Sequence, residues 1–274
     1  MDRSALSIEV ELIVQAIYLR YGYDFRDYSR ASIKRRLELR LEKENLNNLA
    51  ELQHRVIHEP NFFKQLISDF SINVTEMFRD PEFYAAVRGK ILPHLARQPN
   101  LKVWIAGCGT GEEAYSLAIL FKEHNLHEQT QFYATDLNSA SLDRARTGQV
   151  SLKEMRKYSV NYLESGGLGS LMDYFSLTAN QAVLDAGLMR KILFADHNLV
   201  HDQVFGEMDL ILCRNVLIYF NKALQQRVLE LFRESLKPQG YLCLGMKEGL
   251  YFSDLGSDLE TVDNRVKIYR RKAA

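Results

Sequence analysis

The 274 residues carry 35 lysines and arginines against 35 aspartates and glutamates, a balance that argues against a nucleic-acid binder held by a globally basic surface. The length suffices for a full core and a small accessory domain. No run approaches the roughly 18 apolar residues of a membrane span, and no basic segment followed by an apolar core opens the chain, so we expect a cytoplasmic protein without membrane insertion. The scattered cysteines Cys108, Cys213 and Cys243 favour reduced core thiols over disulfides or a metal site.

Apolar residues at helical intervals characterise the first part of the chain, where no convincing strand occurs. They recur from Ile8 to Ile17, from Ile33 to Leu41 and from Leu49 to Val56. We therefore predict a small all-helical domain here.

The helix predicted around residues 29–42 is rich in positive charge. The residues expected on its exposed face are Arg30, Lys34, Arg35, Arg36 and Arg40. Most charge runs are only a solvated helix face, here with Glu38 and Glu42 in local pairs. The functional alternative is a docking face for an acidic partner helix.

Residues 73–80, Asn-Val-Thr-Glu-Met-Phe-Arg-Asp, mix polar and apolar side chains at the junction with the second part of the chain. Polar groups are costly to bury unless each finds a partner, so the cluster suggests a site. The structural alternative is a capped helix start, in which Asp80 and Pro81 mark the first residues of the helix.

The strand–turn–helix pattern of residues 103–116 dominates the second part. Gly107, Gly109 and Gly111 let the backbone of the turn take positive φ and approach a ligand closely. Glu112 and Glu113 then open the helix, where a carboxylate would repel a pyrophosphate. A ligand with hydroxyls and a positive charge but no phosphate, such as S-adenosylmethionine, suits this turn.

A second predicted strand, residues 131–136, ends in Asp136. In such folds an acidic residue at this position accepts both hydroxyl protons of a ribose, so Asp136 is the candidate ribose ligand. The alternatives are that Asp136 only caps the next helix and that the glycine turn is only a tight connection. Turn and acidic strand end together favour a cofactor site.

The later elements are a helix at 139–145, strand-like pieces at 174–177 and 181–184 that suggest a small β insertion, and a strand at 191–199. His197 could act as a base or as a structural hydrogen-bond donor.

The buried strand at 208–213 is followed by Arg214, Asn215 and Tyr219 at the predicted mouth of the ligand crevice. Tyr219 could equally be a packed aromatic residue. A helix from Leu224, a turn at 238–240, a strand at 241–245 and a hairpin of 259–263 with 266–269 complete the prediction.

With these motifs laid out, the chain resembles the chemotaxis receptor methyltransferases, the CheR family of protein-glutamate O-methyltransferases, over nearly its whole length. The motifs that carry the resemblance are residues 73–80, 107–116, 134–136, 197–199 and 213–220. The resemblance implies a class I S-adenosylmethionine-dependent methyltransferase fold, which is Rossmann-like with a mostly parallel sheet and a terminal antiparallel hairpin. It also implies an all-α N-terminal domain and a small β-subdomain insertion.

The implied domains are a receptor-docking helical domain at 1–72, a linker at 73–80 that contributes to the site, and a methyltransferase domain at 81–274 with its insertion at about 170–192. Besides Gly107 of the turn, the cofactor pocket is expected to comprise Asn73, Thr75, Arg79, Glu112, Asp136, Asn198, Leu199, Arg214 and Asn215. Arg79 and Tyr219 are implied as the pair at the methyl-transfer site. That Glu112 rather than Glu113 faces the ligand rests only on motif order.

The implied reaction is methylation of receptor glutamates to methyl esters in chemotactic adaptation, with S-adenosylhomocysteine as product. Lys34, Arg35, Arg36 and Arg40 would recognise the acidic cytoplasmic helices of methyl-accepting chemoreceptors, with a regulatory adaptor as a further partner. We expect a monomer that binds neither metal nor nucleic acid. Because the β insertion lacks a glycine loop between its strands, we expect action without a receptor tether peptide.

Two departures from the family pattern are Ala114 in place of proline and residues 245–248, Gly-Met-Lys-Glu, in place of Gly-His-Ser-Glu. The second puts fine substrate selection in doubt. Three other functions compete with the implied one: a non-catalytic module that binds S-adenosylmethionine, an enzyme acting on a small carboxylate, and a dinucleotide oxidoreductase. Glu112 disfavours the last of these.

Overall fold

The computed structural model describes residues 4–70, 75–204, 206–250 and 258–273. The chain forms two compact units. We call residues 1–72 with 219–227 the helical unit, and residues 73–218 with 228–274 the sheet unit. The chain therefore passes from one unit to the other between Ile218 and Tyr219, and returns between Arg227 and Val228.

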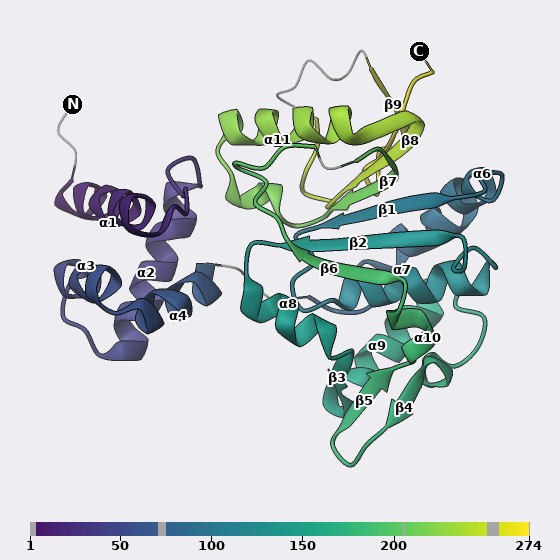
Figure 1. Cartoon of the computed structure of the whole chain (residues 1–274), viewed down its shortest axis with the longest axis horizontal. Helices are drawn as coiled ribbons and strands as arrows, with labels where there is room; N and C mark the ends of the chain where they lie inside the picture. Colours follow the sequence, from purple (N-terminus) through teal and green to yellow (C-terminus); the bar gives the residue numbers. More distant parts are fainter. Residues whose placement is uncertain (1–3, 71–74, 205, 251–257, 274) are drawn as a thin grey trace. The chain divides into compact units, whose positions relative to one another are not determined.

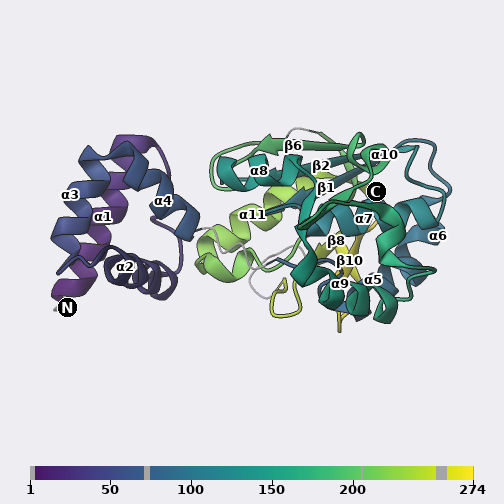
Figure 2. The same cartoon turned by 90° about the horizontal axis from the view of Figure 1, so that it is seen from below.

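Residues 4–70 of the helical unit contain four helices with caps that the sequence supplies. The helices are α1 (Ala5–Tyr21), α2 (Arg30–Glu44), α3 (Leu49–His58) and α4 (Pro60–Phe70). Ser4 accepts a hydrogen bond from the backbone N–H of Ser7, Asn48 accepts one from Glu51, and Gly22 ends α1 in the left-handed conformation. Helix α3 packs against α1 and α4, and α4 against α2 (Figure 2). The predicted all-helical domain is confirmed.

The sheet unit is built on a sheet of seven strands among the described residues, in the order β6-β2-β1-β7-β8-β10-β9 (Figure 1). The strands are β1 (Leu101–Ala106), β2 (Thr130–Asp136), β6 (Ile192–Asp196), β7 (Met208–Cys213), β8 (Leu236–Leu244), β9 (Leu259–Asp263) and β10 (Ile268–Arg271). The pairs from β6 to β8 are parallel, and β10 is antiparallel to both β8 and β9. This is the predicted fold class: a mostly parallel sheet with a terminal antiparallel hairpin.

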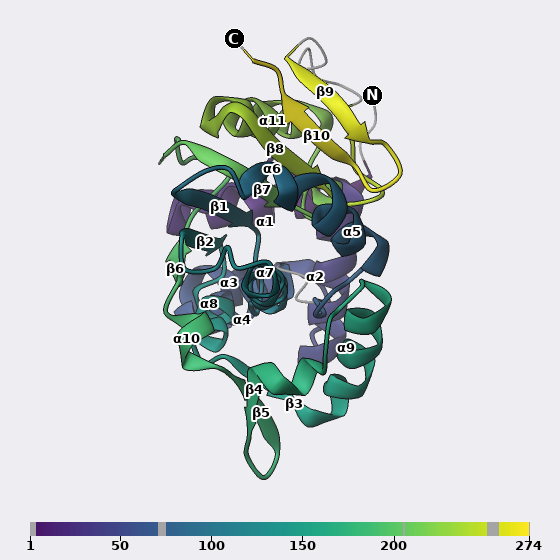
Figure 3. The same cartoon turned by 90° about the vertical axis from the view of Figure 1, so that its right-hand side faces the viewer.

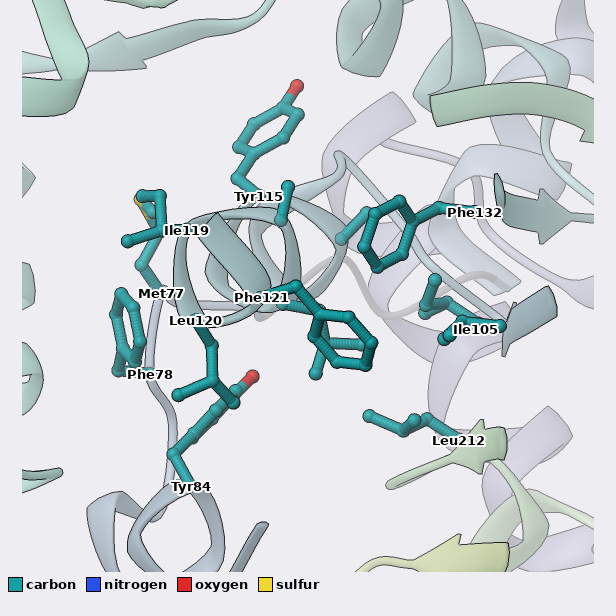
Figure 4. Packing of buried hydrophobic residues seen from close by; sticks show 14 of the residues in the cluster. Met77, Phe78, Tyr84, Ile105, Tyr115, Ile119, Leu120, Phe121, Phe132 and Leu212 are labelled. Carbon is teal, nitrogen blue, oxygen red and sulfur yellow. The ribbon is translucent and has the colours of Figure 1, made fainter. Parts of the chain in front are cut away.

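Helices cover both faces of this sheet, which explains why β1 and β7 are almost continuously apolar. Helix α7 (Glu112–Glu123) lies on one face and α11 (Lys222–Ser235) on the other (Figure 3). Phe121 of α7 points toward the strands that carry Ile105, Phe132 and Leu212 (Figure 4). Trp104 on β1 packs instead against Phe232 of α11, with ring centroids 5.3 Å apart.

The remaining elements of the sheet unit connect these layers. They are α5 (Pro81–Ala86), the π-helical turn η1 (Val87–Ile91), α6 (Leu92–Leu95), α8 (Ser139–Arg146), α9 (Leu152–Glu164), η2 (Leu171–Tyr174) and α10 (Ala186–Met189). The short turn η3 (Leu217–Tyr219) ends at the boundary between the units. No helix in the described part of the chain is long and apolar enough to cross a membrane.

A small antiparallel sheet in the order β3-β5-β4 forms the inserted part of the sheet unit (Figure 3). Its strands are β3 (Gln149–Ser151), β4 (Phe175–Leu177) and β5 (Gln181–Leu184). The sequence analysis identified β4 and β5 but missed β3, which is too short to show periodicity. The buried carboxylate of Glu123 on α7 anchors this region, because it accepts hydrogen bonds from the Tyr162 and Tyr174 hydroxyls and pairs with Arg88.

Strand β6 ends at Asp196 instead of 199, and two further strand boundaries differ from the prediction. Strand β8 begins at Leu236 instead of 241, and the expected turn is a kink within it, where Gln239 has a φ of 67°. Strand β10 begins two residues later than expected because residues 264–267 complete the turn. In both places the turn residues were predicted correctly. The residues at which the strands begin depend on pairing with the neighbouring strand, which the local sequence does not reveal.

Candidate cofactor and active site

The glycine turn between β1 and α7 has no room for a side chain at Gly107 or Gly111. Gly107, Gly109 and Gly111 all have positive φ, at 76°, 55° and 99°. A Cβ atom on Gly107 would lie 2.5 Å from Cγ2 of Val216, and one on Gly111 would lie 2.7 Å from the hydroxyl oxygen of Tyr115. The turn is thus held close to its neighbours by backbone geometry that only glycine adopts without strain.

Asp136 ends β2 directly beside this turn and is 9% exposed. Its Oδ2 accepts a hydrogen bond from the Gly109 N–H (2.8 Å) and its Oδ1 accepts one from the Asn138 N–H (2.9 Å). Burial raises the pKa of Asp136, and these N–H donors act against the rise. A carboxylate has about four lone-pair sites, so capacity remains for a ligand hydroxyl. The cap of α8 is Asn138, so the interpretation of Asp136 as a helix cap is wrong.

The two glutamates that open α7 have different surroundings. Glu113 forms an ion pair with Arg214 (2.7 Å), whereas Glu112 accepts a hydrogen bond from the neutral Thr110 hydroxyl (2.6 Å). Glu112 is 7% exposed, and burial raises its pKa. A buried carboxylate whose partner is neutral gains most from a cationic ligand. This favours Glu112 over Glu113 as the group that faces the cofactor.

Arg214, directly after β7, joins three segments of the sheet unit through its fully buried guanidinium. Nη1 pairs with Glu113, and Nη2 pairs with Asp80 (2.6 Å) and donates to the Arg79 carbonyl (3.3 Å). The guanidinium also lies 4.1 Å from the centroid of the Phe83 ring. Arg214 therefore fixes the relative positions of these segments, and its predicted contact with the cofactor stays a prediction.

The segment before α5 holds Arg79 between two residues in an uncommon conformation. Phe78 and Asp80 have φ values of 52° and 58°. The Phe78 N–H donates to the Ser116 hydroxyl (2.9 Å) on α7, and Met77 and Phe78 pack beside that helix (Figure 4). Asp80 stands at the N-cap position of α5 but makes no capping hydrogen bond with its side chain. The helix therefore starts at Asp80 and Pro81 as the structural alternative predicted, but the Asp80 carboxylate pairs with Arg214 instead of capping the helix.

Three residues of this segment are predicted cofactor ligands. Thr75 and Arg79 are partly exposed. Asn73, predicted as a cofactor ligand, lies outside the described residues.

The turn after β7 depends on a residue that sequence reasoning did not assign. Asn215 has a φ of 62°, and its N–H donates to Glu248 Oε2 (3.0 Å). The buried Glu248 carboxylate also accepts from the Gly245 N–H (2.6 Å) and the Ile218 N–H (3.2 Å). Burial raises the pKa of Glu248, against the effect of these donors. The only sequence signal was a glutamate three residues after a strand-ending glycine.

At the end of β6, Asn198 forms a local turn in which its side-chain oxygen accepts from the Val200 N–H (2.9 Å) and its own N–H donates to Asp202 (2.7 Å). Leu199 is partly exposed beside it. The His197 ring packs edge-on against Trp104 (5.2 Å between centroids), and burial lowers its pKa. This packing favours the structural interpretation of His197 over the catalytic one.

Sheet order brings most of the predicted residues to one edge. Strands β6, β2, β1 and β7 are consecutive and parallel, so their carboxyl ends lie side by side. These ends carry, in the same order, Asn198 with Leu199, Asp136, Gly107 with Glu112, and Arg214 with Asn215. This is the edge at which open α/β sheets bind ligands. Glycines that permit close approach, together with the buried carboxylates of Glu112 and Asp136, fit S-adenosylmethionine.

Tyr219, predicted as the partner of Arg79, belongs to the helical unit, whereas Arg79 belongs to the sheet unit. Their pairing therefore stays a prediction. Within the helical unit the Tyr219 carbonyl accepts a hydrogen bond from the Ser29 N–H (2.7 Å).

The predicted docking face of α2 is only partly exposed. Lys34 and Arg35 are exposed, and Lys34 makes a loose pair with Glu38 (3.7 Å). Arg36 and Arg40 are 4% and 3% exposed, so their prediction as surface docking residues is wrong. They share a helical stripe with Ile33 and Leu37, and i, i+3, i+4, i+7 spacing could have revealed their burial.

We expect the affinity for S-adenosylmethionine to fall as the pH is lowered, because protonation removes the charge of Glu112. Since burial raises its pKa above the ordinary 4.5, this loss begins at a higher pH than for an exposed glutamate. Glu112→Gln keeps the Thr110 contact but should weaken binding by about 1.5 to 3 kcal/mol at neutral pH. Calorimetric titration across the pH range should then show a flatter profile, with the exposed Glu164→Gln as control. An unchanged profile in Glu112→Gln would remove Glu112 from the pocket.

Comparison with known proteins agrees with this geometry. Residues 73–266 match the family model of the CheR methyltransferase SAM-binding domain, and residues 8–71 match the CheR methyltransferase all-alpha domain. A Pseudomonas putida protein named Cher3 is 48% identical over 264 residues, which covers 96% of this chain and 97% of that protein. The chemotaxis protein methyltransferase Cher2 of the same organism is 29% identical, covering 80% of this chain and 82% of its own.

Chemotaxis protein methyltransferase 1 of Pseudomonas aeruginosa is 28% identical over 232 residues, covering 80% of this chain and 81% of that protein. Together the two family models span nearly the whole chain. Its cofactor is S-adenosylmethionine. The chain belongs to the CheR methyltransferase family.

Proposed function

We propose that this protein transfers a methyl group from S-adenosylmethionine to glutamate side chains of chemoreceptors, giving methyl esters and S-adenosylhomocysteine. The relatives named chemotaxis protein methyltransferase support this substrate class. The observation that carries the proposal is the buried Arg214 clamp. It holds the backbone of Arg79 at the strand edge that also carries Glu112 and Asp136. This anchoring of the Arg79 backbone supports the proposal that its side chain meets an acidic substrate at this edge.

Methyl transfer to a carboxylate requires little proton transfer by the protein. S-adenosylmethionine supplies a methyl group on a positively charged sulfur, which leaves as a neutral thioether. An exposed glutamate, with a pKa of about 4.3, is already ionised at neutral pH and needs no general base. The catalytic task of the chain is therefore to hold the carboxylate in line with the bond that breaks, and to exclude water.

In this proposal Arg79 and Tyr219 orient the substrate. The Arg79 guanidinium would bind one or both carboxylate oxygens by charge-assisted hydrogen bonds, and the Tyr219 hydroxyl would donate to one oxygen. The residues beside Arg79 support such a role, because Phe78 and Asp80 keep strained backbone angles that Ser116 and Arg214 stabilise. Strain of this kind is found at functional sites, where surrounding contacts over-determine it.

The proposed docking surface for the receptor is the exposed side of α2, reduced to Lys34 and Arg35. We expect Lys34→Gln with Arg35→Gln to raise the KM for receptor about 3- to 10-fold at low salt, with a smaller effect at high salt because exposed charges are screened. Binding of S-adenosylmethionine should not change. The control is the exposed pair Lys153→Gln with Arg156→Gln on α9, which alters net charge equally. An equal effect of both pairs would show only a general charge effect.

The domain roles follow the same proposal: residues 1–72 dock the receptor, 73–80 link to the site, and 81–274 carry methyl transfer, with the insertion at about 170–192. Residues 178–180, which join β4 to β5, contain no glycine, and this supports action without a tether peptide. We also propose that the protein acts as a cytoplasmic monomer.

Mass spectrometry of receptor peptides after reaction with S-adenosylmethionine tests the substrate class. The proposal predicts added methyl groups on glutamates of the receptor's cytoplasmic helices. Methyl groups on other side chains, or only on small carboxylates added to the mixture, would contradict it.

A further inference from the structure

The backbone around Tyr219 is fixed by the start of α2. Tyr28 and Phe220 form an antiparallel β-bridge, and their rings pack edge-on with centroids 4.9 Å apart. The Ser29 N–H donates to the Tyr219 carbonyl (2.7 Å), and the Asn221 N–H donates to the Asp27 carbonyl (2.8 Å). All these residues belong to the helical unit. The tyrosine is thus held on both sides in sequence by the segment that leads into α2.

Arg36 on the buried side of α2 holds the ring of the same tyrosine. The Cζ atom of Arg36 lies 4.9 Å from the centroid of the Tyr219 ring, within the range of a cation–π interaction. Nη1 of Arg36 donates to the carbonyl oxygens of Asp69 (2.7 Å) and Phe70 at the end of α4. The guanidinium is therefore anchored to one helix end while its face covers the aromatic ring.

The electrostatics agree with this contact. Burial lowers the pKa of Arg36, and the interaction with Tyr219 acts in the opposite direction. Because the tyrosine partly offsets the cost of burying the guanidinium, the two side chains are energetically coupled. Removal of either side chain should therefore change the stability of the other in its position.

We propose that Arg36 is a positioning residue for methyl transfer, which sets the orientation of the Tyr219 ring and hydroxyl. The inference rests on the proposed function of Tyr219 as a group that contacts the substrate carboxylate. A hydroxyl fixed before the substrate arrives costs no reorganisation during reaction. Helix α2 then has two roles: Lys34 and Arg35 face outward for docking, and Arg36 faces inward to hold the catalytic side chain.

Arg40 provides a matched control, because it lies one turn further along the same buried stripe. It pairs with Asp69 and Glu44 (2.9 Å to Glu44) and donates to the Gln65 carbonyl (3.0 Å). Its ring contact is with Phe62, not with Tyr219. Arg40→Lys should therefore disturb the helical unit about as much as Arg36→Lys without reaching the tyrosine.

The test is a double-mutant cycle in the full chain, with kcat measured on receptor at saturating S-adenosylmethionine. Arg36→Lys is expected to lower kcat about 10-fold, equivalent to about 1.4 kcal/mol, and to leave the KM for S-adenosylmethionine unchanged. Tyr219→Phe should lower kcat about 100-fold. In the Tyr219→Phe background the effect of Arg36→Lys should disappear, whereas any effect of Arg40→Lys should persist unchanged.

Additive effects of Arg36→Lys and Tyr219→Phe would overturn the inference and show that Arg36 only stabilises the fold. If Arg36→Lys melts below the assay temperature, Arg36→Gln, which keeps a donor for the Phe70 carbonyl, replaces it in the same cycle. A wild-type protein that methylates no receptor glutamate would instead refute the proposed function. Full activity of Tyr219→Phe would refute the role of Tyr219, and the positioning role of Arg36 with it.

Discussion

Replacing Arg214 by methionine is expected to lower the free energy of unfolding of the sheet unit by about 3 kcal/mol and to abolish methyl transfer. The substitution keeps much of the apolar contact with Phe83 but leaves the carboxylates of Asp80 and Glu113 without their cation. Removing one partner of a buried ion pair is costly because the remaining charge stays in a poorly solvating place. Urea unfolding, followed by circular dichroism, measures the loss.

A compensated variant separates stability from function. Arg214→Met combined with Asp80→Asn and Glu113→Gln removes all three charges and should recover most of the stability. It should not recover activity, since the Arg79 carbonyl would still lack the donor that holds it. Recovery of activity together with stability would show that Arg214 serves the fold alone.

Gly107→Ala is expected to remove measurable S-adenosylmethionine binding and to cost about 2 to 4 kcal/mol of stability. At a φ of 76° an alanine is strained, and its Cβ would meet Val216 Cγ2 at 2.5 Å. Relief of this contact would displace the turn after β7, where Val216 follows Asn215. Isothermal titration calorimetry reports the binding, and thermal unfolding reports the stability.

The control for this substitution is Gly89→Ala in η1, where an added Cβ has nothing within 4 Å and φ is not positive. It should leave both binding and stability within about 0.5 kcal/mol of the parent. Normal cofactor affinity in Gly107→Ala would contradict the assignment of this turn to the pocket.

Features with strong local signals were predictable from the sequence. The glycine turn, the acidic end of β2 and the buried strand before Arg214 depend on backbone conformation and hydrophobic patterning, which neighbouring residues determine. Because parallel strands align their carboxyl ends, these local motifs were sufficient to expect one shared edge. The helical first part was predictable for the same reason.

Features that depend on distant partners were not predictable. The burial of Arg36 and Arg40 is stable only because the end of α4 supplies carbonyl oxygens and Asp69, which lie about 30 residues away along the chain. Glu248 acts through backbone N–H groups of the turn at Asn215, which are equally remote. The charge of the two arginines suggested that they are exposed at the surface. They are buried instead, because hydrogen-bonding partners elsewhere in the chain stabilise them there.

The assignment of Tyr219 to the helical unit was also beyond the sequence. Its motif continues without a break from Asn215, so pattern alone placed the whole stretch in one domain. The β-bridge of Phe220 with Tyr28 and the hydrogen bond from Ser29 are what bring this short segment to the start of α2.

The most direct test of receptor glutamate methylation is transfer of radiolabelled methyl from S-adenosylmethionine to receptor-containing membranes, followed by alkali treatment. The account predicts label that alkali releases as methanol, as expected for an ester, and that falls sharply with Arg79→Ala or Tyr219→Phe. Label that resists alkali would contradict esterification of a carboxylate. Tight cofactor binding with no label on any receptor would contradict catalysis itself, and would favour a non-catalytic module that binds S-adenosylmethionine.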